Sequence, residues 1–212
     1  MKLDDIIKRV QRQFGDDVQA QITKEDIVRW VNDACIEIAS NNATNQGVLK
    51  GQTAVEAGKT EYNLPSDILL LRSVRVNGIK MGHSTFDQIT ELPDFSETAV
   101  GTPLNYWVFD NKLYLYPGPS DSLGTVDIYY VKTPDILTVE MGTKEPDVPK
   151  AYHNRIVEYC IAQAAELDDN IAHYQMKMGQ FKDNLQSLRQ NSEQPEHDDF
   201  YPSISYIGEA VY

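Results

Sequence analysis

The sequence is short of cysteine and of long apolar runs, and each shortage excludes a class of protein. Its two cysteines, Cys35 and Cys160, form no CxxC pair, so neither a disulfide scaffold nor a cysteine-based zinc site is expected. The longest aliphatic run, Ile68 to Leu71, is four residues, whereas a membrane span needs about 20. The acidic start, Met-Lys-Leu-Asp-Asp, is unlike a signal peptide. We therefore expect no membrane helix and synthesis in a reducing cytosol.

Positive charge is also scarce. Lysine and arginine number 19 against 32 aspartates and glutamates, which gives a net charge of −13. A dedicated nucleic-acid-binding protein depends on cations that displace counterions from phosphate. Such a protein is therefore not expected, although an acidic surface can tolerate DNA that passes nearby.

Motifs that carry chemistry are nearly absent. The chain has no GxGxxG, no P-loop and no HExxH. Residues 82–86, Gly-His-Ser-Thr-Phe, miss the nucleophile elbow G-x-S-x-G because Phe86 stands where glycine is needed for the tight turn. Ser84 or Thr85 as the start of a helical turn is the simpler interpretation. We predict a non-enzymatic interaction protein without cofactor or metal, and keep a small serine hydrolase around Ser84 and His83 as the alternative.

The first 45 residues read as two helices. Apolar residues at 3.6-residue spacing predict an amphipathic helix over residues 3–14, which Gly15 ends in a left-handed conformation. Thr23 and Asp26 resemble a capping box, so a second helix should run to about Ser40 and pack on the first. Cys35 falls on its buried face and is expected to fill the core.

The carboxy-terminal third also reads as helix. Asp147 and Pro149 suit a helix start, where the aspartate would accept free N–H groups. Residues 168–170, Asp-Asp-Asn, are expected to break the helix or to cap it again. Apolar residues then follow at alternating spacings of three and four from Ile171 to Leu188, a pattern typical of a helix that packs along another helix.

Between these helical parts, about residues 49–132, the apolar period changes to two and turn residues recur, which predicts short antiparallel strands. Asn77-Gly78 and Asp110-Asn111 suit two-residue type I′ turns. The second turn sets Trp107 opposite Tyr114, and both faces of its hairpin are apolar. A hairpin covered on both faces belongs inside a sandwich, inside a barrel or at a subunit interface.

Residues 191–212 form an unusual tail, because they contain five acids and no lysine or arginine but also seven apolar side chains. Ordering each residue costs about 1–2 kcal/mol, whereas burying each apolar side chain returns about 1.5–3 kcal/mol. The tail is therefore expected to dock on a partner, with folding back on its own body and permanent disorder as alternatives. The predicted partner-binding side chains are Phe200, Tyr201, Ile204, Tyr206, Ile207 and Tyr212.

Together these segments predict an α+β chain. The expected helical bundle combines helices from residues 1–45 and 147–190, a central antiparallel β sandwich or barrel occupies 46–135, and an extended acidic and aromatic arm covers 191–212. At 212 residues the chain is long enough to bury a core without a disulfide or metal.

Four segments carry a resemblance to a known family. They are the YNLPSD segment at 62–67, Gly101-Thr102-Pro103 with Tyr106, the LYLYPGP segment at 113–119, and the PKAYH segment at 149–153. In this order, behind a helix pair, the chain resembles bacteriophage head-to-tail adaptors, also called connector or head-completion proteins, and in particular tail tubular proteins. The likeness spans about residues 24–190.

The resemblance implies a structural virion protein at the head–tail interface, assembled in the host cytoplasm. It implies a homo-oligomeric ring, usually of twelve copies, that docks beneath the portal ring after DNA packaging and provides the platform for the tail or nozzle protein. DNA would pass through its channel without specific binding, because acids that line a channel repel phosphates. A tail-completion or scaffold protein without portal binding is the other structural alternative.

Overall fold

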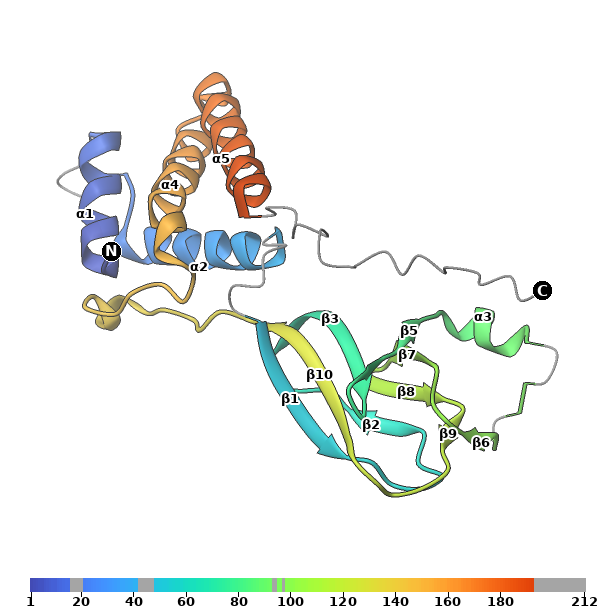
Figure 1. Cartoon of the computed structure of the whole chain (residues 1–212). Helices are drawn as coiled ribbons and strands as arrows, with labels where there is room; N and C mark the ends of the chain where they lie inside the picture. Colours follow the sequence, from blue (N-terminus) through green and yellow to red (C-terminus); the bar gives the residue numbers. More distant parts are fainter. Residues whose placement is uncertain (16–20, 42–47, 93–94, 97, 193–212) are drawn as a thin grey trace, which may run out of the picture.

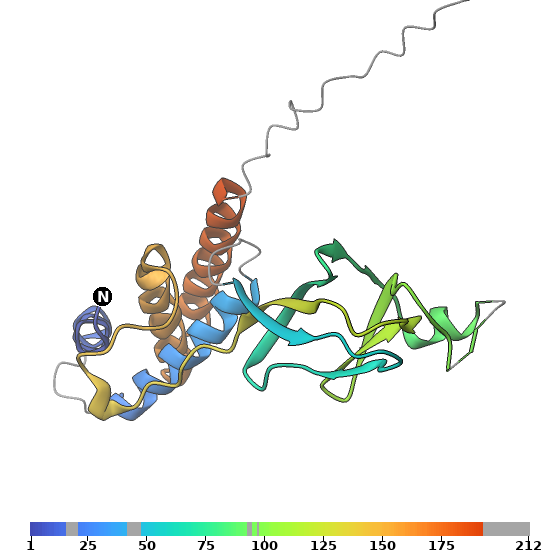
Figure 2. The ribbon, with the colours of Figure 1, turned by 60° about the horizontal axis from the view of Figure 1, so that its bottom comes forward.

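The computed structural model describes residues 1–15, 21–41, 48–92, 95–96 and 98–192, with the side chains of 188–192 left aside. These residues form an α+β structure in which the four long helices gather at one end and the sheets, with one short helix (Phe86–Thr90), at the other (Figure 1). Figure 2 shows from a second side that the segment after the last strand runs back along the helical end toward the fourth helix. The central strands are thus inserted between two helical parts of the chain.

The amino-terminal helices follow their sequence signals closely. Helix α1 spans Leu3–Phe14 and ends at Gly15, whose φ of 84° is the left-handed conformation that glycine adopts without strain. Helix α2 spans Lys24–Asn41. Thr23 Oγ1 accepts a hydrogen bond from the Asp26 backbone N–H at 3.1 Å, and the Asp26 carboxylate accepts one from the Thr23 N–H at 3.3 Å. The predicted capping box is confirmed.

The carboxy-terminal helices confirm the predicted break and correct the predicted start. A 3₁₀ turn, Lys150–Tyr152, leads into α4 (His153–Leu167), and α5 (Ile171–Ser192) follows after a turn in which Asp169 has a φ of 55°. The prediction that Asp147 caps this helix is wrong, because neither the 3₁₀ turn nor α4 has a side-chain cap. The Asp147 carboxylate lies 2.8 Å from Lys132 Nζ, at the end of strand β10 (Thr125–Lys132), and this ion pair competes for the oxygen atoms that a cap would use.

All four long helices contribute to one apolar core. Phe181 of α5 is fully buried and meets the Tyr159 ring of α4 edge-on at 5.1 Å between centroids. Cys35 and Cys160 are buried here as free thiols, and burial raises the pKa of Cys35 to about 12, as expected for core side chains. The core also includes Leu3, Ile6, Val10, Ile22, Ile27, Trp30, Val31, Ala34, Ile38, Ile156, Ala164 and Leu185.

The strands form two four-stranded sheets and a short third pair that share the β end of the molecule. The first sheet has the order β1-β10-β3-β4 and the second β2-β8-β7-β5, while β6 pairs with β9. Their bounds are β1 Val48–Ala54, β2 Glu61–Asn63, β3 Ile68–Val76, β4 Ile79–Lys80, β5 Gly82–His83, β6 Val100–Gly101, β7 Asn105–Phe109, β8 Lys112–Tyr116, β9 Gly118–Pro119 and β10 Thr125–Lys132. Side chains from both large sheets, among them Val74, Val126, Leu113 and Leu115, make one buried cluster. A short helix α3, Phe86–Thr90, and a 3₁₀ turn, Val139–Met141, complete the described elements.

Both predicted hairpin turns are confirmed. Asn77 and Gly78 have φ values of 53° and 80°, and Asp110 and Asn111 have 47° and 56°, so all four occupy the left-handed region that a type I′ turn requires. Strand pairing places Val76 opposite Ile79 and Trp107 opposite Tyr114, as the turns dictate.

Two strand pairs depart from the antiparallel prediction. Strand β5 runs parallel to β7, and β6 runs parallel to β9. The first pair is parallel because α3 and β6 lie between β5 and β7 in the chain. This crossover connection lets the chain enter β7 in the same direction in which it ran through β5. Alternation alone could not reveal these two-residue pairings. Pro119 was expected only to bound a strand but lies within β9.

Asn32 of α2 ties the returning segment to the helical core. Its Nδ2 donates to the Leu137 carbonyl at 3.0 Å, and its Oδ1 accepts from the Leu137 N–H at 2.9 Å. Because Leu137 is 2% exposed, both backbone groups would be buried and unpaired without this side chain.

We expect Asn32→Ala to lower the free energy of unfolding by about 1–3 kcal/mol, measured by urea denaturation. Asn41→Ala at the exposed end of α2 is the control, and an equal loss in both variants would contradict this role.

Candidate interaction surfaces

The six predicted partner-binding side chains between Phe200 and Tyr212 lie outside the described residues. The structure does fix where the tail departs, because α5 ends at Ser192. Lys182, Leu185 and Gln186 of α5 line a hollow together with Glu37 and Asn41 of α2. The last turns of α5 therefore run beside the end of α2, which leads into the first strand.

An aromatic row crosses the second sheet on its outer side. The rings of Trp107 and Tyr114 stack at 5.2 Å between centroids with 9° between their planes, and Phe86 of α3 lies 6.1 Å from Trp107. At the other end Tyr114 donates to Glu61 at 3.4 Å, and Lys112 Nζ lies 2.7 Å from the same carboxylate. The hydrogen bond from Lys112 lowers the pKa of Glu61. We call Phe86, Trp107 and Tyr114 the aromatic row.

The two faces of this hairpin are not equally covered. Tyr106, Leu113 and Leu115 are buried in the β core, whereas Trp107 and Tyr114 are half-buried and Phe86 is 54% exposed. The sequence placed this hairpin inside a sandwich, inside a barrel or at a subunit interface. For the face that carries Trp107 and Tyr114, a location in the interior of the monomer is wrong. The reason is that the second sheet has a neighbouring sheet on one side only.

The serine and histidine of the hydrolase alternative are not arranged for nucleophilic catalysis. The His83 ring packs edge-on against Tyr106 at 5.2 Å, and the Ser84 backbone N–H donates to the Tyr106 carbonyl at 2.9 Å. Thr85 caps α3 by accepting from the Gln88 N–H, which confirms the helical-turn interpretation. In the part of the chain that the structure describes, the Ser84 hydroxyl has no hydrogen bond to a histidine or carboxylate, so it lacks the base that a serine nucleophile needs.

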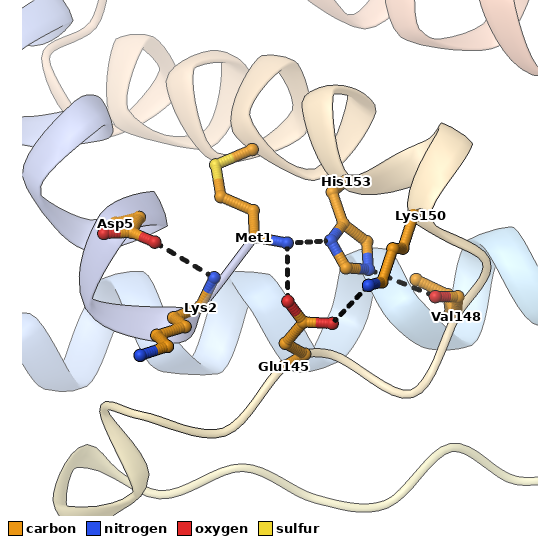
Figure 3. Close-up of polar contacts among 7 residues, drawn as sticks. All are labelled: Met1, Lys2, Asp5, Glu145, Val148, Lys150 and His153. Atoms are coloured by element: carbon orange, nitrogen blue, oxygen red, sulfur yellow. Dashed lines mark hydrogen bonds and ion pairs between the residues drawn. The ribbon is translucent and has the colours of Figure 1, made fainter.

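The PKAYH segment has a structural use that its sequence did not reveal. His153 is 3% exposed and accepts, through Nδ1, a hydrogen bond from the Met1 amine at 2.6 Å (Figure 3). Its Nε2 lies 3.1 Å from the Val148 carbonyl, which fixes the proton of the neutral ring on that nitrogen. Glu145 bridges the Met1 amine and Lys150 at 3.3 and 3.6 Å. This histidine therefore clamps α1 to the start of α4.

The clamp predicts a pH dependence of stability. Burial, followed by the positive Met1 amine, lowers the pKa of His153 in the folded protein below 6.5. The unfolded chain then binds the proton more readily than the folded protein. The contribution of His153 to the free energy of unfolding is therefore fully present above pH 6.5 and is lost as the pH drops toward the lower pKa of the folded protein. We expect a His153→Gln variant to lose part of this slope in urea denaturations compared between mildly acidic and neutral pH. Identical slopes in the two proteins would contradict it.

The described residues contain neither a cluster of metal ligands nor a membrane-spanning helix. No group of three or more histidine, cysteine, aspartate or glutamate side chains there is placed to hold a metal ion. No helix among them combines the length and apolar character needed to cross a bilayer.

Comparison with known proteins agrees with the structural motifs. No curated protein matches the chain. The family model described as SU10 adaptor protein matches residues 1–200, which include all four segments of the resemblance and every described helix and strand. The chain therefore belongs to the SU10 adaptor protein family, a family of bacteriophage head-to-tail adaptors.

Proposed function

We propose that this protein forms the adaptor ring that docks beneath the portal after DNA packaging and carries the tail. The observation that supports this proposal most is the family match over residues 1–200. The sequence motifs within this range have structural roles, in turns and in the contact between α1 and α4. The ring of twelve copies would lie in the neck of the virion and leave a channel for DNA. With a net charge of −13 on each copy, acids at the channel wall would let the genome slide without binding.

We assign portal contact to the tail. Phe200, Tyr201, Ile204, Tyr206, Ile207 and Tyr212 give it the composition of an interface core, in which aromatic anchors enter pockets. One weak arm gains little affinity alone. Repeated around a ring, each docking event raises the effective concentration of the next arm, so the ring binds tightly.

We assign contact between copies to the aromatic row. Copies of an acidic chain repel one another, so their contact needs a surface on which charge is neutralised. The carboxylate beside the rings, Glu61, is paired with Lys112, and the half-buried rings offer apolar area that a neighbouring copy covers. Trp and Tyr are also the residues in which binding energy concentrates.

Binding to isolated portal rings tests the adaptor role. Full-length protein is expected to sediment with portal, and electron microscopy should show a second ring beneath it. Replacing the six tail side chains by serine should abolish co-sedimentation and leave the fold intact, because the described members of both buried clusters lie at or before Leu185. Met176→Ala, on the exposed side of α5, is the control. Full binding by the tail variant would refute the tail assignment, and binding to tail proteins but not to portal would identify a tail-completion protein instead.

A further inference from the structure

The outer face of the sheet β1-β10-β3-β4 carries a cluster of cations that the adaptor role does not explain. Lys50 of β1 lies opposite Tyr129 of β10, and Arg75 of β3 lies opposite Lys80 of β4. Lys50 Nζ and the Arg75 guanidinium are 5.9 and 6.0 Å from the centre of the Tyr129 ring. Two cations therefore flank one half-buried aromatic ring, on a protein in which basic residues are scarce.

A β-bulge adds another cation to this face. The pairing of β10 with β3 skips Arg72, so Arg72 and Ser73 both face the hollow on the outer side. That hollow has a volume of about 200 Å³ and is lined by Val48, Arg72, Ser73, Arg75 and Tyr129. We call Lys50, Arg72, Arg75, Lys80 and Tyr129 the basic face.

The carboxylate on this face pairs with Lys50, and within the described part of the chain Arg75 and Lys80 make no ion pair. Asp127 lies 3.0 Å from Lys50 Nζ and accepts from Gln52 at 2.9 Å. Burial disfavours the charged form of Asp127, but the hydrogen bonds from Lys50 and Gln52 outweigh it and lower the pKa of Asp127. The carboxylate therefore stays ionised and bound to these two residues of β1. Arg75 and Lys80 are exposed directly opposite each other, an arrangement of like charges that is unfavourable until an anion approaches.

We propose that the basic face binds the acidic first part of the tail, residues 193–199. This segment reads Glu-Gln-Pro-Glu-His-Asp-Asp, with four carboxylates and no lysine or arginine, and it precedes the aromatic residues assigned to the portal. Its carboxylates complement Arg72, Arg75 and Lys80.

The position of α5 favours this occupant. Helix α5 ends at Ser192, directly before this segment, and its last turns lie beside the end of α2. Residues 42–47 connect α2 to Val48, which itself lines the basic hollow. Seven extended residues reach about 23–25 Å, and tethering raises their local concentration to the millimolar range. A DNA duplex, in contrast, must approach against the net charge of −13.

Zero-length carbodiimide cross-linking of the full-length protein, without portal, tests the proposal. Mass spectrometry should find links from Glu193, Glu196, Asp198 or Asp199 to Lys50 and Lys80, and high salt should suppress them. Mixing isotopically light and heavy protein shows whether the tail binds its own copy or a neighbour, and either result supports docking. Links that concentrate on Lys177 and Lys182 of α5, or spread evenly over all lysines, would overturn it.

A double variant sharpens the test. Arg72→Glu with Arg75→Glu leaves both target lysines and every tail carboxylate in place, so the yield of these links should fall about tenfold. Arg9→Glu with Arg12→Glu, at the second basic hollow on α1, is the matched control and should leave the yield unchanged.

A short fluorescent DNA duplex should not bind at physiological salt. Duplex binding that the double variant abolishes would mean that the basic face is a nucleic-acid site and would refute tail docking. Because no portal is present, failure here leaves the adaptor role untouched.

Discussion

Replacing Phe181 by alanine is expected to lower the free energy of unfolding by about 3–5 kcal/mol, the largest stability loss foreseen for a single side chain. The Phe181 side chain is fully buried between helices and packs edge-on against Tyr159, so its removal leaves a cavity and deletes an aromatic contact. Leu185, one turn later, is 8% exposed and cannot fill the gap alone. Helix α5 would then lose its main hold on α4.

Urea denaturation followed by circular dichroism measures this loss. Met176→Ala on the same helix is the control, because Met176 is 51% exposed and should cost less than about 1 kcal/mol. Since the tail departs from the end of α5, loosening this helix should also weaken portal binding in proportion to the unfolded fraction. A Phe181 variant as stable as the Met176 variant would show that α5 is not packed on α4 in solution.

The sequence predicted those parts of the fold that short-range chemistry determines. Gly15 ends α1, Thr23 and Asp26 start α2, and Asn77-Gly78 makes its turn because each depends on residues within about four positions. Asp147 failed as a cap because a distant lysine, Lys132, takes its carboxylate. A sequence pattern cannot weigh such a competitor.

The candidate surfaces were predicted less well, and for the same reason. The predicted Asn77-Gly78 turn places Arg75 opposite Lys80, but Lys50 and Tyr129 join this pair only through the pairing of β1, β10 and β3, which are far apart in the chain. Arg72 joins through a bulge that has no signal in the sequence. Likewise, the apolar alternation of the β7–β8 hairpin predicted two covered faces, because alternation cannot distinguish a buried face from an apolar face that the isolated chain leaves half-buried.

Trp107→Ala separates those two possibilities. A fully buried tryptophan would cost about 3–5 kcal/mol on truncation, but the half-buried Trp107 is expected to cost about 1–2 kcal/mol in the isolated chain, measured by urea denaturation. If neighbouring copies cover the aromatic row, the same change should raise the protein concentration needed to complete a ring on the portal by about tenfold or more. The tail would still bring single copies to the portal.

The number of copies bound to each portal ring, counted by native mass spectrometry, distinguishes these effects. Val108→Ala is the control, because Val108 is 40% exposed in the same strand and belongs to the opposite side of the hairpin. A Trp107 variant that fills the ring at wild-type concentration would remove the aromatic row from the contact between copies. A loss near 5 kcal/mol in the isolated chain would mean that the row is already covered within one copy. Only a small loss of stability combined with an incomplete ring fits a surface that the fold leaves open for its neighbour.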